Sequence, residues 1–461
     1  MGHSNPDPAP LTASGASALQ GTVTVPGDKS ISHRALMFAG LSAGSVRISG
    51  LLEGEDVLRT VQAMQALGAI VEKTETAAGN VWEVHGRGVG GLVEPEKPID
   101  FGNSGTGVRL LMGVIAGHDM TATLIGDASL SRRPMQRILT PLYRMGLQVV
   151  GEARDKLPLT IKGSANLIPI EYELPVPSAQ VKSAVLIAGL HAPGQTTVLE
   201  REATRDHTER MLKYLGADIR IEQRGDLRAI TVSGDAELTG RDIEVPGDPS
   251  SAAFIVAAAL LVPGSDVTVT GVLVNDTRTG FYTTLREMGA SIELLNERES
   301  GGETIADIRA RFSQLRGVRV PPGRAPSMID EYPMLSVVAA FASGETRMEG
   351  LAELKVKESD RLAATADGLA ACGVQARIDG DTLIVTGMPG DVPGSDRPGH
   401  SNRVATQLDH RIAMAFLIMG LASRYPVTID DSAMIATSFP QFCSLLTSIG
   451  GCFESATVKQ P

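Results

Sequence analysis

The hydrophobic residues of the chain gather in six runs of about ten positions. Each run begins with polar residues and is then apolar on almost every face, a pattern that predicts a helix buried on all sides. Only the polar first turn of each helix is therefore expected to meet solvent. The runs begin near residues 30, 103, 178, 249, 330 and 409.

A second pattern alternates with these runs and marks the ends of other helices. A large apolar residue is followed by glycine and then by alternating apolar and polar positions, which predict a strand. Glycine suits the left-handed conformation in which many helices end. The glycines are Gly68, Gly146, Gly216, Gly289, Gly373 and Gly450. Together the two patterns predict six copies of one α/β unit.

The two halves of the chain are most alike around two Pro-Gly pairs, at 26–27 and 246–247, which lie 220 residues apart. Pro-Gly pairs favour turns, so these are the points where we expect the chain to cross between lobes. We predict an N-terminal lobe of three units over 28–245. The C-terminal lobe, also of three units, is predicted to combine 18–27 with 246–461.

The formal net charge of −11 argues against nonspecific binding to nucleic acid or acidic lipid, since no large positive field is available. An anionic ligand must be held locally. The start of a helix carries unpaired N–H groups and about half a positive charge. Several buried helices opening into one cleft would therefore attract anions.

Cysteine content and the chain ends indicate a reducing compartment. The three cysteines show no Cys-x-x-Cys spacing, so neither a disulfide framework nor a zinc site is predicted, and we interpret them as small core residues. Residues 1–17 lack the apolar segment of a signal peptide and are predicted to be a disordered tail. No apolar run reaches the ~20 residues that span a membrane. We expect a cytoplasmic protein.

Two segments could hold a phosphate or a carboxylate. Lys29 and Ser30 stand at a helix start with Arg34 one turn beyond, which groups ammonium, hydroxyl and guanidinium on one face. The glycine-rich segment 102–107 lets the backbone approach an anion, although it matches neither the dinucleotide-binding nor the Walker pattern. Alone, each also fits a polar helix cap or a tight turn.

Other charged segments are individually typical of helix caps or solvated surface. They become candidates for ligand binding because they occupy matching positions in different repeats. The segments are Arg132–Arg133, Lys182, Arg205, Asp330–Glu331, Lys357–Arg361 and Asp409–Arg411.

Six ordered motifs resemble the signatures of the EPSP synthase family, and the resemblance covers residues 18 to 455. Two further segments, 327–333 and 434–440, are most similar to the class II branch. The six motifs are Pro-Gly-Asp-Lys-Ser-Ile-Ser-His-Arg from residue 26, Gly-Asn-Ser-Gly-Thr from 102, Arg-Pro-Met from 133, Ser-Ala-Gln-Val-Lys-Ser-Ala from 178, Lys-Glu-Ser-Asp-Arg from 357 and Asp-His-Arg-Ile-Ala-Met from 409.

The resemblance implies two domains, each an inside-out α/β barrel of three βαβαββ units, with the active site in the interdomain cleft. It implies transfer of the enolpyruvyl group of phosphoenolpyruvate to the 5-hydroxyl of shikimate 3-phosphate, with release of phosphate through a tetrahedral intermediate. That reaction belongs to the shikimate pathway and uses no metal or organic cofactor. We expect a monomer whose partners are these two small molecules.

Carried over residue by residue, the resemblance implies three catalytic residues. Asp330 would be the base on the attacking hydroxyl, Glu358 would protonate the methylene carbon, and Lys29 would contact both substrates. The shikimate 3-phosphate site would comprise Lys29, Ser30, Arg34, Ser178, Ala179, Gln180, Arg205, Asp330 and Lys357. The phosphoenolpyruvate site would comprise Lys29, Asn103, Gly105, Arg133, Gln180, Arg361 and Arg411, with Lys357 beside it.

Two positions bear on inhibition and phosphate binding. Thr437 stands where many family members carry lysine, so another cation must compensate or the contact is absent. Position 105 is Gly, as in glyphosate-sensitive branches, although Leu110 follows the class II pattern. We therefore predict inhibition by glyphosate.

Three alternatives remain at this point. A UDP-N-acetylglucosamine enolpyruvyl transferase shares the fold but uses a cysteine in the first lobe, and this chain has none before Cys372. A noncatalytic clamp-like ring also repeats α/β units, but it has no need of the 357–361 motif. A binding-only paralogue would be expected to lack more of the charged residues.

Overall fold

The computed structural model describes residues 9–77, 79–152, 154–234, 237–389 and 401–455. The described residues form two compact units. Unit 1 contains those of 1–26, 247–298 and 305–461, and unit 2 contains those of 27–246 and 299–304. The chain thus leaves unit 1 after its first strands and returns to it near residue 247.

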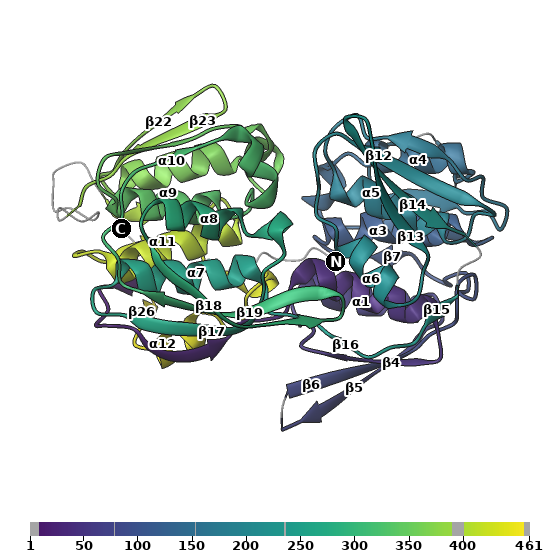
Figure 1. The fold of residues 1–461 in the computed structure, drawn as a ribbon, viewed down its shortest axis with the longest axis horizontal. Helices are drawn as coiled ribbons and strands as arrows, with labels where there is room; N and C mark the ends of the chain where they lie inside the picture. The colour runs from purple at the N-terminus through teal and green to yellow at the C-terminus, as the bar shows by residue number, and fades with distance from the viewer. Residues whose placement is uncertain (1–8, 78, 153, 235–236, 390–400, 456–461) are drawn as a thin grey trace. The chain divides into compact units, whose positions relative to one another are not determined.

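Unit 2 is built on three buried helices, α1, α3 and α5, and α3 packs against the other two (Figure 1). Three more polar helices, α2, α4 and α6, cover this core. The helices of unit 2 are α1 (Lys29–Leu41), α2 (Glu55–Ala66), α3 (Gly105–Ala116), η1 (Leu130–Arg132), α4 (Gln136–Met145), α5 (Ala179–Gly189) and α6 (His207–Tyr214).

The strands of unit 2 form three four-stranded sheets, in the orders β16-β4-β6-β5, β7-β8-β10-β9 and β11-β12-β14-β13, and a small pair β15-β3. Each four-stranded sheet has a parallel pair at one edge. The strands are β3 (Ser42–Ala43), β4 (Ser45–Ser49), β5 (Ile70–Thr76), β6 (Gly79–His85), β7 (Ile99–Asp100), β8 (Thr121–Ile125), β9 (Gln148–Val149), β10 (Leu159–Lys162), β11 (Glu171–Glu173), β12 (Gln195–Glu200), β13 (Ile219–Arg224), β14 (Leu227–Ser233), β15 (Leu238–Thr239) and β16 (Ile243–Glu244).

Unit 1 is built on α7, α9 and α11, which contact one another pairwise (Figure 1). Every residue of α7 is buried, as its apolar pattern predicts. The helices of unit 1 are α7 (Pro249–Leu261), η2 (Asp276–Arg278), α8 (Gly280–Glu287), η3 (Pro322–Ser327), α9 (Tyr332–Phe341), η4 (Ala352–Val356), α10 (Arg361–Ala371), α11 (His410–Ala422), η5 (Ala433–Thr437) and α12 (Phe442–Ser448).

Unit 1 also contains three four-stranded sheets, in the orders β18-β19-β17-β2, β20-β21-β23-β22 and β24-β25-β1-β26, each with a parallel edge pair. The residues that join β18 to β19, 299–304, group with unit 2. The strands are β1 (Leu11–Ser14), β2 (Gln20–Thr24), β17 (Asp266–Leu273), β18 (Ser291–Ser300), β19 (Glu303–Arg311), β20 (Arg319–Val320), β21 (Glu345–Met348), β22 (Gln375–Asp379), β23 (Thr382–Thr386), β24 (Arg403–Val404), β25 (Val427–Ile429) and β26 (Cys452–Ser455).

The glycines predicted to end helices adopt the predicted conformation. Each follows one of the helices α2, α4, α6, α8, α10 and α12, and each has a φ between 78° and 120°. An L-residue with a side chain rarely adopts this backbone conformation, so glycine is the natural residue there.

The expectation of a disordered tail over 1–17 is wrong for residues 11–14. These residues form β1, which pairs antiparallel with both β25 and β26. Ala13 is completely buried against Gly420 of α11. A small residue at this position lets the strand approach the helix, so the segment is ordered by partners about 400 residues away. Residues 1–8 lie outside the described residues.

Among the described helices, none combines the length and the apolar character needed to cross a bilayer.

Candidate active site

The start of α1 holds the first group of predicted site residues, in unit 2. Asp28 caps the helix by accepting a hydrogen bond from the Ile31 amide at 2.8 Å. Lys29 forms an ion pair with Asp56, whose carboxylate is almost buried. The lysine remains a quarter exposed, so its ammonium is fixed by one carboxylate and still reachable by an anionic ligand.

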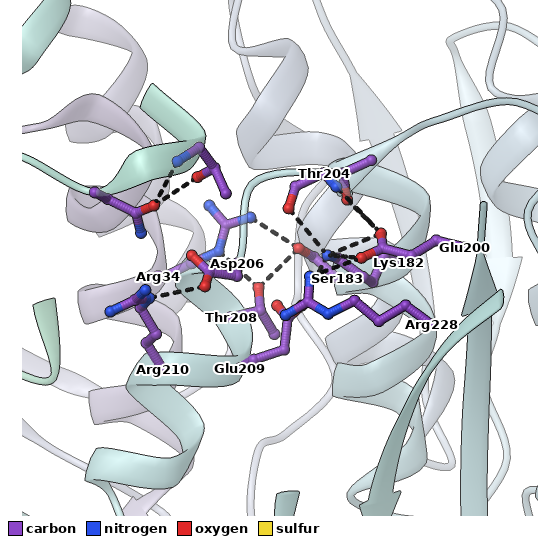
Figure 2. A network of polar contacts seen from close by, with 12 residues as sticks. Arg34, Lys182, Ser183, Glu200, Thr204, Asp206, Thr208, Glu209, Arg210 and Arg228 are labelled. Carbon is purple, nitrogen blue, oxygen red and sulfur yellow. Dashed lines mark hydrogen bonds and ion pairs between the residues drawn. The ribbon is translucent and has the colours of Figure 1, made fainter. Parts of the chain in front are cut away.

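Arg34 lies on the same helix, and each of its three guanidinium nitrogens donates a hydrogen bond. Figure 2 shows its side chain beside Thr208 and Ser183. Nε donates to Thr208 Oγ1 at 2.7 Å, one Nη donates to Ser183 Oγ at 2.8 Å, and the other donates to the Ser30 carbonyl at 2.8 Å. Burial lowers the pKa of Arg34 to about 10, with the Glu209 carboxylate opposing that shift. The side chain is thus a positioned cation at neutral pH.

Behind Arg34 lies a completely buried ion network centred on Lys182 (Figure 2). Its ammonium lies 2.7 Å from Glu209 and 3.1 Å from Glu200. Glu200 also accepts hydrogen bonds from Thr204 at 2.8 Å and Arg228 at 3.0 Å. Lys182 is therefore a structural residue, which agrees with leaving it out of the predicted binding sets.

The glycine-rich loop before α3 holds the second group. Asn103 accepts a hydrogen bond from Arg133 at 2.8 Å and donates one to Asp127 at 2.9 Å. Gly105 is the first residue of α3, and a Cβ placed on it would lie 3.2 Å from Arg133 and 3.6 Å from Arg109. The loop thus brings a helix start and two guanidinium groups together without a side chain between them.

The third group lies at the start of α5. Ser178 caps this helix through a hydrogen bond from Val181 at 3.4 Å, and Ala179 is its first residue. Gln180 accepts from Arg109 at 2.9 Å and donates to Thr106 at 3.1 Å, which locks its amide in one orientation. Arg205, also in unit 2, is half-buried, and its charge acts on Arg34.

In unit 1, one guanidinium joins three carboxylates. Arg361 is 1% exposed and lies 3.2 Å from Asp330, 2.6 Å from Glu358 and 2.8 Å from Asp409. Burial opposes the charge of Arg361, but the three carboxylates together raise its pKa above the ordinary arginine value. The predicted base and the predicted acid are therefore bound to the same side chain.

Asp409 connects this group to α11. One carboxylate oxygen caps the helix by accepting from the Arg411 amide at 2.9 Å, and the other accepts from Arg361 and from Ser359. Burial favours protonation, but the charges of Arg361 and His410 and the hydrogen bond from Arg361 together lower the pKa of Asp409. The carboxylate stays ionised and orients the start of α11.

Glu331 is a second buried acid beside Asp330. It accepts a hydrogen bond from Ser250 and lies 3.9 Å from the Arg411 guanidinium. Burial and the neighbouring Asp330 raise the pKa of Glu331. From the sequence, Glu331 was named only together with Asp330, as a polar segment at the start of a helix.

Two predicted positions complete unit 1. The Lys357 ammonium lies 3.8 Å from Oδ1 of Asp330, the same oxygen that lies 3.2 Å from the buried Arg361. Thr437 donates its hydroxyl to the Met434 carbonyl at 2.7 Å. Its side chain is thus bonded to its own turn of η5.

The structure therefore brings the predicted residues together in two sets, one in each unit. Sequence analysis did not identify Thr208 and Ser183 as the side chains that hold Arg34. The motif Asp-His-Arg pointed to Asp409, whereas no local signal marked Thr208 or Ser183 as partners of Arg34.

A buried cluster near α6 also escaped sequence analysis. Asp206, His207 and Glu303 place their ligand-type atoms within 4.8 Å of one another. His207 lies 2.7 Å from Glu303, and Arg210 lies 2.8 Å from Asp206 and 3.7 Å from Glu303. A guanidinium thus already compensates the two carboxylates.

Comparison with known sequences gives one family. Residues 13–446 match the model of "EPSP synthase (3-phosphoshikimate 1-carboxyvinyltransferase)". A 3-phosphoshikimate 1-carboxyvinyltransferase of Parvibaculum lavamentivorans is 59% identical over 98% of each chain. That of Methylorubrum populi is 58% identical over 98% of this chain and 99% of its own.

Solved structures give the same result. An EPSP synthase from Acinetobacter baumannii superposes with a TM-score of 0.86 at 42% identity, covering 97% of this chain and all of that one. The enolpyruvyl transferase NikO from Streptomyces tendae superposes with a TM-score of 0.76 at 19% identity, which indicates a shared fold.

Proposed function

The chain belongs to the EPSP synthase family, and from this premise we propose how its residues divide the work of the reaction. The enzyme is a 3-phosphoshikimate 1-carboxyvinyltransferase, which transfers an enolpyruvyl group in the shikimate pathway. Its substrates are phosphoenolpyruvate and shikimate 3-phosphate. The fold is α/β with mixed sheets, close to that of solved EPSP synthases.

We propose that units 2 and 1 correspond to the predicted lobes, 28–245 and 18–27 with 246–461. We further propose that each lobe is an inside-out barrel of three βαβαββ units. Three four-stranded sheets in each unit, all with a parallel edge pair, support this proposal. The expected active site in the cleft between the lobes is supported by chemistry, since neither set of residues alone supplies both the anion sites and the acid–base pair.

Unit 2 is proposed to hold most of the phosphate and carboxylate ligands. Lys29, Ser30, Arg34, Ser178, Ala179, Gln180 and Arg205 would bind shikimate 3-phosphate, with Asp330 and Lys357 of unit 1. Asn103, Gly105, Arg133, Lys29 and Gln180 would bind phosphoenolpyruvate, with Arg361 and Arg411 of unit 1. The supporting observation is that the unit 2 residues other than Arg34, Arg133 and Arg205 lie at the starts of α1, α3 and α5, where backbone N–H groups point outward.

Unit 1 is proposed to supply proton transfer. Asp330 would remove the proton from the attacking hydroxyl, while Glu358 would deliver a proton to the methylene carbon of the enolpyruvyl group. Addition and the later loss of phosphate need opposite proton movements in one geometry, which two separate carboxyl groups can divide. Arg361 binds both carboxylates at 3.2 and 2.6 Å, so their spacing is preset.

Charge stabilisation completes the mechanism. The tetrahedral intermediate keeps the phosphate and carboxylate charges of phosphoenolpyruvate until phosphate leaves. Fixed guanidinium groups such as Arg133 stabilise these charges without having to reorganise during the reaction. The proposed steps use only side chains, and we expect a cytoplasmic monomer that needs no cofactor.

The observation that carries the proposal is the bridge from Asp330 through Arg361 to Glu358. It is tested by phosphate release from phosphoenolpyruvate, with shikimate 3-phosphate or UDP-N-acetylglucosamine as acceptor. Release is expected with shikimate 3-phosphate alone, and Asp330→Asn is expected to abolish it while leaving the unfolding midpoint close to that of the parent. An Asp330→Asn enzyme with unchanged turnover would remove Asp330 from the catalytic role.

A further inference from the structure

Unit 2 has an open pocket of about 840 Å³ that is separate from the proposed active-site residues. Helices α1, α3 and α5 begin at proposed site residues, and residues that closely follow their C-terminal ends line this pocket, namely Ala43, Gly117 and Leu190. At 1.5 Å per residue, these helices place the pocket about 16–20 Å from the proposed substrate ligands. The pocket is therefore a second site to be explained.

The first unusual group in the pocket wall is His118, which is 3% exposed. Its Nδ1 lies 2.8 Å from the carbonyl oxygen of Val114. A carbonyl only accepts, so Nδ1 carries the proton of this bond. Nε2 therefore carries a lone pair, and it finds no hydrogen-bond partner among the described residues.

His191 lies beside it. The two ring centroids are 4.7 Å apart with the planes at 63°. Nε2 of His191 also lacks a hydrogen-bond partner in the described part of the chain. A Cβ on Gly117 would lie 2.2 Å from the His191 ring, so glycine is what permits this close pairing.

Two adjacent buried nitrogens without partners need an explanation, because leaving a buried polar atom unpaired is unfavourable. The charged groups around the pocket indicate the charge of a ligand that could pair with these nitrogens. The pocket wall contains the exposed carboxylates Glu94, Asp119 and Glu237, and its described lining residues include neither Lys nor Arg. Helix C-termini add partial negative charge. The pocket thus favours a cation.

We propose that His118 and His191 bind a divalent transition-metal ion of the zinc class through their Nε2 atoms. Zinc binds imidazole nitrogen at about 2.0–2.1 Å, and a carboxylate of the pocket wall and water would complete its coordination. A neutral imidazole whose other nitrogen donates to a backbone carbonyl is the usual state of a metal-binding histidine. Both Nε2 atoms are closed to solvent, so binding requires the partly exposed His191 ring to turn toward the pocket.

The cluster of Asp206, His207 and Glu303 provides a rival site within the same unit. It has more ligand-type atoms, but Arg210 pairs with both of its carboxylates. Placing a divalent ion there would bring it against a guanidinium, which like-charge repulsion disfavours. The two sites differ in the histidine that they require, so they can be separated by substitution.

The test is calorimetric titration of the full chain with Zn²⁺ at neutral pH, after removal of metals with a chelator. One ion per chain is expected to bind the parent. His118→Gln and His191→Gln should each weaken binding at least about tenfold. Matched controls are His207→Gln at the rival cluster, His85→Gln on β6 and His3→Ala near the N-terminus, and all three should bind Zn²⁺ as the parent does.

Two further readouts make the result decisive. Trp82, the single tryptophan, lies in unit 2, so its fluorescence verifies that each variant is folded there. Co²⁺ in place of Zn²⁺ should give an absorption spectrum typical of nitrogen ligation that both pocket variants lose. The proposal is overturned if the folded parent binds no Zn²⁺, if neither pocket variant weakens binding, or if binding is lost in His207→Gln alone.

Discussion

Arg361 donates a hydrogen bond from Nη1 to Oδ1 of Asp330 over 3.2 Å, and the guanidinium is almost completely buried. Its other nitrogens bind Glu358 and Asp409. A buried arginine with three carboxylates is held by charge on every side, so it has little freedom to move. Acid, base and helix cap are therefore fixed by one residue.

Glu358→Gln should separate proton delivery from binding. Glutamine keeps the size of the side chain and can still accept from Arg361, but it cannot donate an acidic proton. Loss of a general acid typically lowers a rate by about 10²–10⁴, so we expect kcat to fall by that factor and both KM values to change much less. Steady-state phosphate release measures this. A kcat within tenfold of the parent would contradict the assigned role.

Arg361→Lys should not be conservative. One ammonium cannot reproduce the planar fork that binds three carboxylates in different directions. We expect kcat/KM for phosphoenolpyruvate to fall by at least about tenfold, because the residue is proposed both to bind that substrate and to fix its two carboxyl partners. Arg319→Lys is the matched control, since Arg319 pairs with Glu349 at the exposed surface. Equal effects of the two changes would rule out the bridging role.

Thr208→Val should act on one substrate only. Valine keeps the shape of threonine but removes the hydroxyl that accepts from Arg34 Nε at 2.7 Å. An unpaired buried donor costs about 1–3 kcal/mol, and Arg34 is the proposed ligand of shikimate 3-phosphate. We expect KM for that substrate to rise by about fivefold or more, with KM for phosphoenolpyruvate unchanged.

The control for Thr208 is Thr231→Val. Thr231 shares a buried hydroxyl pair with Thr197 at 2.8 Å on neighbouring strands of the same unit. The Thr231→Val substitution therefore also removes a buried threonine hydroxyl, but at a site that does not contact Arg34. If Thr231→Val raises KM for shikimate 3-phosphate as much as Thr208→Val does, the effect is a general loss of packing.

Gly105→Ala should reduce inhibition by glyphosate, which we predict for the parent enzyme. The added methyl group would lie 3.2 Å from the Arg133 guanidinium, tighter than ordinary contact. Overpacking of this kind costs about 1–3 kcal/mol when the neighbours cannot move. We expect the inhibition constant to rise at least fivefold, and KM for phosphoenolpyruvate to rise less, on the order of twofold.

Gly323→Ala is the control for Gly105, because a Cβ there meets no atom within 4 Å. Inhibition constants from competition with phosphoenolpyruvate measure both variants. An unaltered inhibition constant for Gly105→Ala, or a parent that glyphosate does not inhibit, would contradict the prediction.

Features set by neighbouring residues could be predicted from the sequence, whereas features set by residues far along the chain could not. Helix ends such as Gly146 were predictable because glycine, a preceding apolar residue and a following strand are neighbours in the sequence. The segment 11–14 was not, because four residues gain their order from strands about 400 positions away. Likewise Lys29 and Arg34 stand in one motif, whereas Thr208, which holds Arg34, comes from α6, 174 residues further along the chain.

The buried Lys182 network gives a prediction about stability. Lys182→Met removes the cation that lies between Glu200 and Glu209 and leaves two buried carboxylates. Arg228 still compensates Glu200, so Glu209 carries most of the penalty. Breaking a buried ion pair in this way costs about 3–5 kcal/mol, and we expect the free energy of unfolding of unit 2 to fall by that amount. Urea unfolding followed by Trp82 fluorescence reports unit 2 specifically.

The same measurement can identify the cause. If an uncompensated carboxylate is responsible, Lys182→Met with Glu209→Gln should recover at least half of the loss, because the second change removes the buried charge. The loss in the single variant should also shrink as the pH is lowered toward 5, since protonation favours the folded state of a chain with an unpaired buried acid. A loss that is independent of pH and not recovered in the double variant would instead indicate that Lys182 acts through packing of its methylene groups.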